Sequence, residues 1–267
     1  MTASDPDDLR QIAIELARDA AGYVAKARSF DSDGSGPIGD VLMAGTTTKS
    51  TSTDMVTAVD KATEVRIVAA LGERRPNDGV MAEEGTGIAS KTGVLWVIDP
   101  IDGTTNFVYG YPAFAVSIAA TDVANGESIA GAVIDVVRGE VFSAARGLGA
   151  WLDDDALTLG DGPEDIGHCL VGTGFSYSRE TRAEQAKVLV RLLPAVRDIR
   201  RGGSAALDLC WAAAGRVDAY FERGTAPWDR AAGLLIAHEA GLRGEFVDDM
   251  VWVAHPRIAD ELLTLIF

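Results

Sequence analysis

The sequence predicts a layered α/β sandwich, with helices covering mixed β-sheets, and not a purely doubly wound parallel sheet. Amphipathic helices and short apolar strands alternate along most of the chain. The middle, from residue 113 to 152, instead shows strands separated by glycine turns, which indicates an antiparallel meander. Interleaved helices and strands around an antiparallel middle are typical of a layered mixed α/β fold.

Length and composition leave room for a large core. The 267 residues fit one large domain or two tightly packed lobes, and 47% of them are hydrophobic. No internal repeat or long linker interrupts the chain. We therefore expect a single domain over residues 1–267, with approximate halves at 1–152 and 153–267.

Helices are expected where apolar residues recur at three- and four-residue spacing and where capping residues frame a segment. The first covers residues 7–28, and Ser204 is expected to cap a later one that stops at Gly215. The full set of expected helices is 7–28, 58–73, 180–193, 204–214, 227–240 and 258–266.

Strands are expected in short apolar runs that end at turn residues or acids. Two of these runs, 79–82 and 94–98, end at Glu83 and Asp99. The remaining expected strands are 113–120, 129–136, 140–145, 150–152, 170–172 and 217–222. The segment 31–53 is rich in Gly, Ser, Thr and Asp, and we expect it to be a mobile loop.

The net charge narrows the classes of partner. Twenty-four Lys plus Arg against 40 Asp plus Glu give 24 − 40 = −16, which disfavours nucleic acid and anionic membranes as partners. The acidic N-terminus lacks a signal-peptide core, and no apolar run reaches the ~18 residues of a membrane span. Cys169 and Cys210 lie in apolar runs and are expected to be buried thiols. We expect a cytoplasmic protein.

The chemistry is concentrated between residues 96 and 107. An apolar strand there runs into Asp99 and Asp102, and Pro100 between them stiffens the turn. A rigid set of carboxylates, with the carbonyl of Ile101 as a further oxygen ligand, suits magnesium. The glycine and hydroxyl residues that follow offer backbone N–H groups to a phosphate. Taken alone, this turn is as consistent with two solvent-exposed acids as with a metal site.

Two further acidic segments favour the metal interpretation. Glu83-Glu84 follows an apolar strand, and Asp229 follows Trp228 at the start of a helix. If these ends converge at one sheet edge, they supply enough oxygens for two or three metal ions. Cations are needed there in any case, because a chain of this charge repels an anionic substrate.

These motifs together resemble the inositol monophosphatase family, most closely its actinobacterial members. The resemblance rests on Asp99 to Asn106, Glu83-Glu84, Asp54 to Asp60 and Trp228 to Gly233, which occur in the family's order and spacing. Gly203 to Ala206 and Asp218 to Glu222 are similar to the family's substrate-side segment. The match extends across nearly the whole chain.

The resemblance implies an α-β-α-β-α sandwich of the sugar-phosphatase type, commonly a homodimer, that hydrolyses a small phosphate ester with two to three Mg²⁺ ions and is sensitive to lithium. Residues 1–152 would form the metal-binding half and 153–267 the substrate-side half. The substrate that the resemblance implies is myo-inositol 1-phosphate, hydrolysed by metal-activated water.

The resemblance also assigns roles to residues. Glu83, Thr104 and Asp60 would be catalytic. The metal ligands would be Glu83, Asp99, Ile101, Asp102 and Asp229. The substrate contacts would be Asp102, Gly103, Thr104, Ala205, Glu222 and Asp229, and Lys49 would act from a mobile loop.

Several alternatives remain at this stage. The chain departs from the family at Ala82, where glycine is more usual, and at Pro227, near the substrate wall. Other sugar or nucleotide phosphatases of the superfamily, acting on fructose 1,6-bisphosphate, histidinol phosphate or 3′-phosphoadenosine 5′-phosphate, are the alternatives. A regulatory binding protein with the same fold is another. Arg200-Arg201 is expected to be a surface pair.

Overall fold

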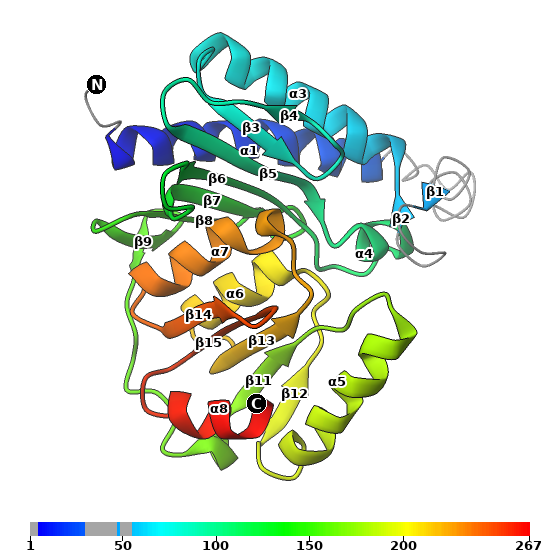
Figure 1. The fold of residues 1–267 in the computed structure, drawn as a ribbon, viewed down its shortest axis with the longest axis vertical. Helices are drawn as coiled ribbons and strands as arrows, with labels where there is room; N and C mark the ends of the chain where they lie inside the picture. The colour runs from blue at the N-terminus through cyan, green and yellow to red at the C-terminus, as the bar shows by residue number, and fades with distance from the viewer. Residues whose placement is uncertain (1–4, 30–46, 49–54) are drawn as a thin grey trace.

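The computed structural model describes residues 5–29, 47–48 and 55–267, and their order of layers is the predicted one (Figure 1). Helices α1 and α3 cover the outer face of an eight-stranded sheet, and α5 and α8 lie outside a five-stranded sheet. Helices α6 and α7 lie between the two sheets. The helices are α1 (Pro6–Ser29), α3 (Ala58–Arg74), α4 (Thr104–Tyr109), α5 (Arg179–Leu192), α6 (Ala205–Ala213), α7 (Pro227–Glu239) and α8 (Ala259–Ile266).

The larger sheet has the strand order β10-β9-β8-β7-β6-β5-β3-β4. Its strands are β3 (Gly79–Ala82), β4 (Gly87–Ile88), β5 (Val94–Asp102), β6 (Ala115–Asp122), β7 (Ser128–Asp135), β8 (Val141–Ala145), β9 (Gly149–Leu152) and β10 (Asp155–Leu157). Only β3 and β5 pair in parallel, and every other neighbour pair described in this sheet is antiparallel. The predicted antiparallel meander is confirmed.

The smaller sheet has the order β12-β11-β13-β15-β14. Its strands are β11 (Leu170–Thr173), β12 (Asp198–Arg200), β13 (Ala219–Arg223), β14 (Arg243–Val247) and β15 (Met250–Ala254), with a 3-10 turn η1 (Ile166–His168) before β11. Two residues with positive φ, Asp248 and Asp249, join β14 to β15. This tight hairpin has the backbone twist that antiparallel strands favour.

Three apolar clusters fill the spaces between the layers, because each inner layer buries both of its faces. One lies between α1, α3 and the larger sheet, and includes Trp96 and Ile67. The second joins the two sheets through α6 and α7, and includes Phe142 and Tyr220. The third lies under α5 and α8. Cys169 and Cys210 are buried free thiols, as expected.

Helix starts agree with the capping residues of the sequence. Ser204 accepts a hydrogen bond from the N–H of Leu207 at 3.3 Å and caps α6, as predicted. Thr57 and Asp60 cap α3 reciprocally. Pro227 occupies the first turn of α7, where its missing N–H costs nothing.

Some elements differ from the prediction. Strand β5 does not end at Ile98 but continues to Asp102 with a register shift against β6. The short elements β4, α4, β10, β12, β14 and β15 were not predicted from the pattern. All six are two to six residues long, too short to show a clear period.

Lys49 and most of the predicted loop 31–53 lie outside the described residues. Among the described residues in and next to this segment, the two-residue strands β1 (Thr47–Thr48) and β2 (Met55–Val56) pair antiparallel. No helix in the described ranges is both long and apolar enough to cross a bilayer.

Candidate active site

The parallel pairing of β3 and β5 brings the first acids together. Ala82 lies opposite Ile98 in register, so Glu83, which directly follows β3, lies beside Asp99, which is still part of β5. The backbone N–H of Glu83 donates to the carbonyl of Ile98 at 3.2 Å. The carboxyl groups of Glu83 and Asp99 are in direct contact. The acid-ended strands therefore meet as the sequence predicts.

Pro100 is accommodated within β5 because the neighbouring strand β3 has already ended at this point. Pairing with β3 stops at Ile98, so no hydrogen bond is lost there to the missing N–H. On the other side, the register with β6 shifts between Asp99 and Asp102. Asp99 Oδ1 accepts the N–H of Ile101 at 3.0 Å, which fixes the turn. Asp99, Ile101 and Asp102 are all buried.

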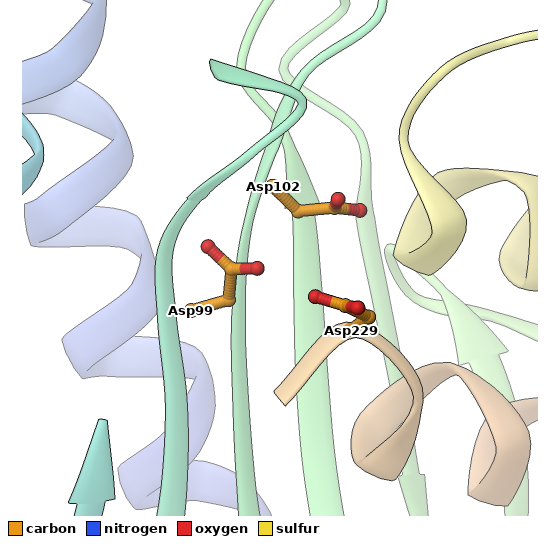
Figure 2. Close-up of side chains that lie close together, drawn as sticks. All are labelled: Asp99, Asp102 and Asp229. Carbon is orange, nitrogen blue, oxygen red and sulfur yellow. The ribbon is translucent and has the colours of Figure 1, made fainter. Parts of the chain in front are cut away.

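Asp229 reaches the same place from the other half of the chain. It lies in the first turn of α7, and its Oδ2 accepts the N–H of Ala226 at 2.7 Å. Carboxylate oxygens of Asp99, Asp102 and Asp229 lie within 4.8 Å of one another. Figure 2 shows the three side chains facing a common space, two from β5 and one from α7. This spacing allows one cation to contact all three.

Burial and mutual repulsion raise the pKa values of this acid cluster. The pKa of Asp99 is well above its usual range because of burial and the neighbouring Glu83, Asp102 and Asp229. Burial also raises the pKa of Asp102 to about 7, and burial followed by the charge of Asp102 raises that of Asp229. Buried like charges at this distance are costly unless a cation or protons offset them.

The donor set fits a hard divalent cation. Its members are carboxylate oxygens together with the Ile101 carbonyl, and these are the ligands that Mg²⁺ and Ca²⁺ prefer over softer metals. A cation among Asp99, Asp102 and Asp229 would offset the repulsion that raises their pKa values.

A hydroxyl–carboxylate pair adjoins the acid cluster. Thr104 Oγ1 lies 3.0 Å from Asp60 Oδ1 and 3.1 Å from the carbonyl oxygen of Ile101, and its one proton can serve either acceptor. The other oxygen of Asp60 accepts from Thr57 N at 2.8 Å and Thr57 Oγ1 at 2.5 Å. Asp60 is fully buried, and burial raises its pKa. This pair is placed to relay a proton from Thr104.

Asp102 connects the two halves of the chain. Its Oδ2 accepts from Ser204 Oγ at 2.6 Å and from Ala206 N at 2.7 Å, both in the first turn of α6. Sequence reasoning assigned Ser204 to capping and to the segment similar to the family's substrate-side segment, but not to a bond with Asp102. The residue that caps α6, Ser204, therefore also holds the carboxylate of Asp102 through a hydrogen bond.

A cavity of about 420 Å³ opens over these groups. Nine of the sequence-predicted residues line it: Glu83, Asp99, Ile101, Asp102, Gly103, Thr104, Ala205, Glu222 and Asp229. Asp60 lies behind Thr104. Gly103 has φ +92, and a Cβ there would approach the carbonyl of Ala113 to 3.0 Å, so the turn into α4 requires glycine.

Glu222, in β13, lines the same cavity. Its Oε2 accepts the hydroxyl of Tyr220 at 2.5 Å. Burial raises the pKa of Glu222, although Tyr220 and Arg201 oppose the shift. Tyr220 was not singled out from the sequence, because its role depends on a contact within β13.

Other lining residues escaped sequence reasoning. Arg200 and Arg201 are both exposed, which confirms the prediction of a surface pair, and Arg201 also lines the cavity. Arg223, Tyr177 and two serines, Ser176 and Ser178, also line it. The Tyr177 hydroxyl lies 3.4 Å from that of Thr105, which brings the segment before α5 against α4. Residues 176–178 follow no recognisable motif in the sequence, and only the tertiary fold places them at the cavity.

Five stacked layers and a polar cavity with clustered carboxylates agree with the sugar-phosphatase fold and site that the resemblance implies. The sequence pattern of the inositol monophosphatase family matches residues 5–250, and the chain belongs to that family. It is 46% identical to an inositol-1-monophosphatase of Mycobacterium leprae, over 97% of this chain and 94% of the relative. The solved structure of Mycobacterium tuberculosis SuhB matches with a TM-score of 0.82 and 44% identity, covering 98% of this chain and 97% of that chain. A Nus factor SuhB of Pasteurella multocida is 42% identical over 86% of this chain and 82% of the relative.

Proposed function

We propose that this phosphatase hydrolyses myo-inositol 1-phosphate to myo-inositol and phosphate in a Mg²⁺-dependent reaction. The observation that carries the proposal is the grouping of Asp99, Asp102 and Asp229 oxygens within 4.8 Å, at the floor of the cavity. Glu83 and Thr104 border the same floor. The similarity to relatives named inositol-1-monophosphatase supports the choice of substrate.

We assign the metal ligands from this arrangement. Glu83, Asp99, the Ile101 carbonyl and Thr104 would hold one ion, and Asp99, Asp102 and Asp229 a second, with Glu83 contributing to a weaker third. Bound there, Mg²⁺ neutralises phosphate charge and acts as a Lewis acid toward water and the leaving oxygen.

The chain's own groups then handle the water and its proton. Glu83 orients the attacking water, and the Thr104 hydroxyl, 3.0 Å from Asp60, passes a proton toward that carboxylate. The water oxygen bonds to phosphorus as the ester P–O bond breaks, and the leaving alkoxide takes up a proton to become the free hydroxyl. The reaction needs no covalent enzyme intermediate.

Substrate orientation comes from both halves of the chain. The backbone N–H groups of Gly103 and Thr104 are assigned to the phosphate. Asp102, Ala205, Glu222 and Asp229 are assigned to the inositol hydroxyls, and all four line the cavity. A cavity of about 420 Å³ suits a ligand of this size.

A second candidate substrate is a sugar bisphosphate such as fructose 1,6-bisphosphate. Arg201 and Arg223 line the cavity and offer cations to a second phosphate. A regulatory role is the other candidate, favoured by the relatives named Nus factor.

A panel of esters tests these proposals. Phosphate release is measured from inositol 1-phosphate, fructose 1,6-bisphosphate, histidinol phosphate and 3′-phosphoadenosine 5′-phosphate, with and without Mg²⁺. Fast release from another ester and none from inositol 1-phosphate would overturn the substrate assignment. Release that is independent of Mg²⁺ would overturn the mechanism. A cellular role that survives Asp99→Asn would be independent of the metal chemistry.

Four further properties stay predictions. Homodimer formation is testable by light scattering, lithium inhibition by assay, and cytoplasmic location by fractionation. The assignment of 1–152 to metal binding and 153–267 to substrate binding is testable by comparing variants of each half. The boundary at residue 152 does not coincide with the end of the larger sheet, because β10 (Asp155–Leu157) pairs with β9 and belongs to that sheet.

A further inference from the structure

We propose that Glu64 is a positioning residue that aims Glu83 at the metal site. The inference rests on the proposed Mg²⁺-dependent function. Glu64 belongs to α3 and is only 3% exposed. Its Oε2 accepts Glu84 N at 2.7 Å, and its Oε1 accepts Thr86 N at 3.0 Å and Thr86 Oγ1 at 2.5 Å. All three donors lie in the turn that follows β3.

The contacts of this turn fix the backbone on both sides of Glu83. Its own N–H donates to the carbonyl of Ile98 on β5 at 3.2 Å, and the next N–H donates to Glu64. Ala82 N donates to the carbonyl of Thr86 at 3.0 Å, which closes the turn. With the peptides before and after Glu83 anchored, the direction of its side chain toward Asp99 is set.

One helix thereby holds two parts of the active site. Asp60 and Glu64 are four residues apart on α3, so they project from the same face. Asp60 reaches Thr104 after β5, and Glu64 reaches the turn after β3. Helix α3 packs against β5, the strand that pairs with β3, on the outer face of the larger sheet (Figure 1). The helix therefore sets the spacing between Glu83 and the Asp99–Thr104 segment.

The bonds to Glu64 require a carboxylate. It accepts on both oxygens, whereas the amide of glutamine has one acceptor and would face an N–H group with its NH₂. A carboxylate that orients a metal ligand through hydrogen bonds typically changes metal affinity by about 10–100-fold when it is replaced.

Asp78 provides a matched control. It directly precedes β3, at the opposite end of the strand from Glu83, and is 5% exposed. Its carboxylate accepts from Arg75, from Thr92 Oγ1 at 2.6 Å and from Trp96 Nε1 at 3.0 Å. Asp78→Asn thus removes a buried, multiply bonded carboxylate next to the other end of β3, away from the metal site.

The test measures Mg²⁺ binding by calorimetry, with the metal alone, in the full-length wild type, Glu64→Gln and Asp78→Asn. We expect the dissociation constant to rise at least about tenfold in Glu64→Gln and to change less than about twofold in Asp78→Asn. Thermal unfolding without Mg²⁺ should show both variants destabilised. If Glu64→Gln does not fold, Glu64→Asp, which keeps the charge but shortens the reach, takes its place with the same expectation.

The possible failures are distinguishable. A wild type that binds no Mg²⁺ would overturn the proposed function, and the inference with it. A wild type that binds Mg²⁺ while the Glu64 variant binds equally well would overturn the inference alone. Equal weakening in both variants would also overturn it, because general loosening of β3 would then explain the effect.

Discussion

Replacing Ser204 with alanine should separate the two tasks of its hydroxyl. The side chain is 1% exposed. Its oxygen accepts from Leu207 N at 3.3 Å, which caps α6, and its proton goes to Asp102 Oδ2 at 2.6 Å. The substitution removes both bonds and leaves Asp102 with the N–H of Ala206. It should therefore weaken both the start of α6 and the connection between the two halves.

The expected loss of stability follows from these two bonds. Loss of a helix N-cap costs about 1 kcal/mol. A buried hydrogen bond to a carboxylate contributes about 1.5–3 kcal/mol. Together they predict that the free energy of unfolding falls by about 2–4 kcal/mol, because both groups are buried and water cannot replace the lost partner. In a chain of this length that corresponds to a fall in Tm of about 5–12 °C.

Ser178→Ala is the matched control for the assay, which is urea and thermal unfolding without metal. Ser178 caps α5 by accepting from Thr181 N at 3.3 Å, and its hydroxyl donates to Glu180 and not to a site carboxylate. We expect Ser178→Ala to cost about 1 kcal/mol. The excess loss in Ser204→Ala then measures the bond to Asp102. Equal losses in the two variants would refute the reasoning.

Three other predictions concern the core and the charged groups. Gly233→Ala places a Cβ 2.8 Å from that of Leu209 where α7 crosses α6, so urea unfolding should show a net loss of about 1 kcal/mol, and a gain would contradict this crossing. Burial raises the pKa of Cys169 to about 12 and that of Cys210 well above its usual range. Neither thiol should therefore react with an aromatic disulfide until urea unfolds the chain. Fast reaction of the native protein would contradict the burial of these thiols. Burial alone would raise the pKa of Asp78, but its hydrogen bonds lower it below 3.8. The wild type should therefore have a higher Tm than Asp78→Asn, with the whole difference present above pH 3.8. The difference should disappear as the pH falls through the lower pKa that Asp78 has in the folded state. A difference in Tm that does not depend on pH would show that the ionised carboxylate is not its cause.

Much of the acid cluster was predictable because its carboxylates come in short, spaced segments. Asp99 and Asp102 stand in one stiff turn, and Glu83 follows a strand whose parallel pairing with β5 confirms the expected meeting of their ends. Helix starts at Ser204 and Pro227 were also predictable, since capping is a local property.

Other parts depend on contacts between distant segments. Arg201 is exposed as expected, but its position on the cavity wall was not predictable, because adjacent arginines carry no sign of a cavity that forms between distant segments. Glu64 was not singled out, although it lies four residues after Asp60, because its partners lie 20 and 22 positions further along the chain. Strands such as β12, with three residues, exist only because a neighbour offers hydrogen bonds.

The sequence by itself determined the class of fold, the family pattern and the identity of the acids. Periodicity, capping and motif spacing are local properties, so the order of the residues alone shows them. Only the tertiary structure decided which acids share one space. Asp229 joins Asp99 and Asp102 because α7 starts at the edge where β5 ends, 127 positions after Asp102 by 229 − 102. The same packing decided which buried groups hold them, since a hydrogen bond such as that from Ser204 to Asp102 requires the two halves to be folded against each other.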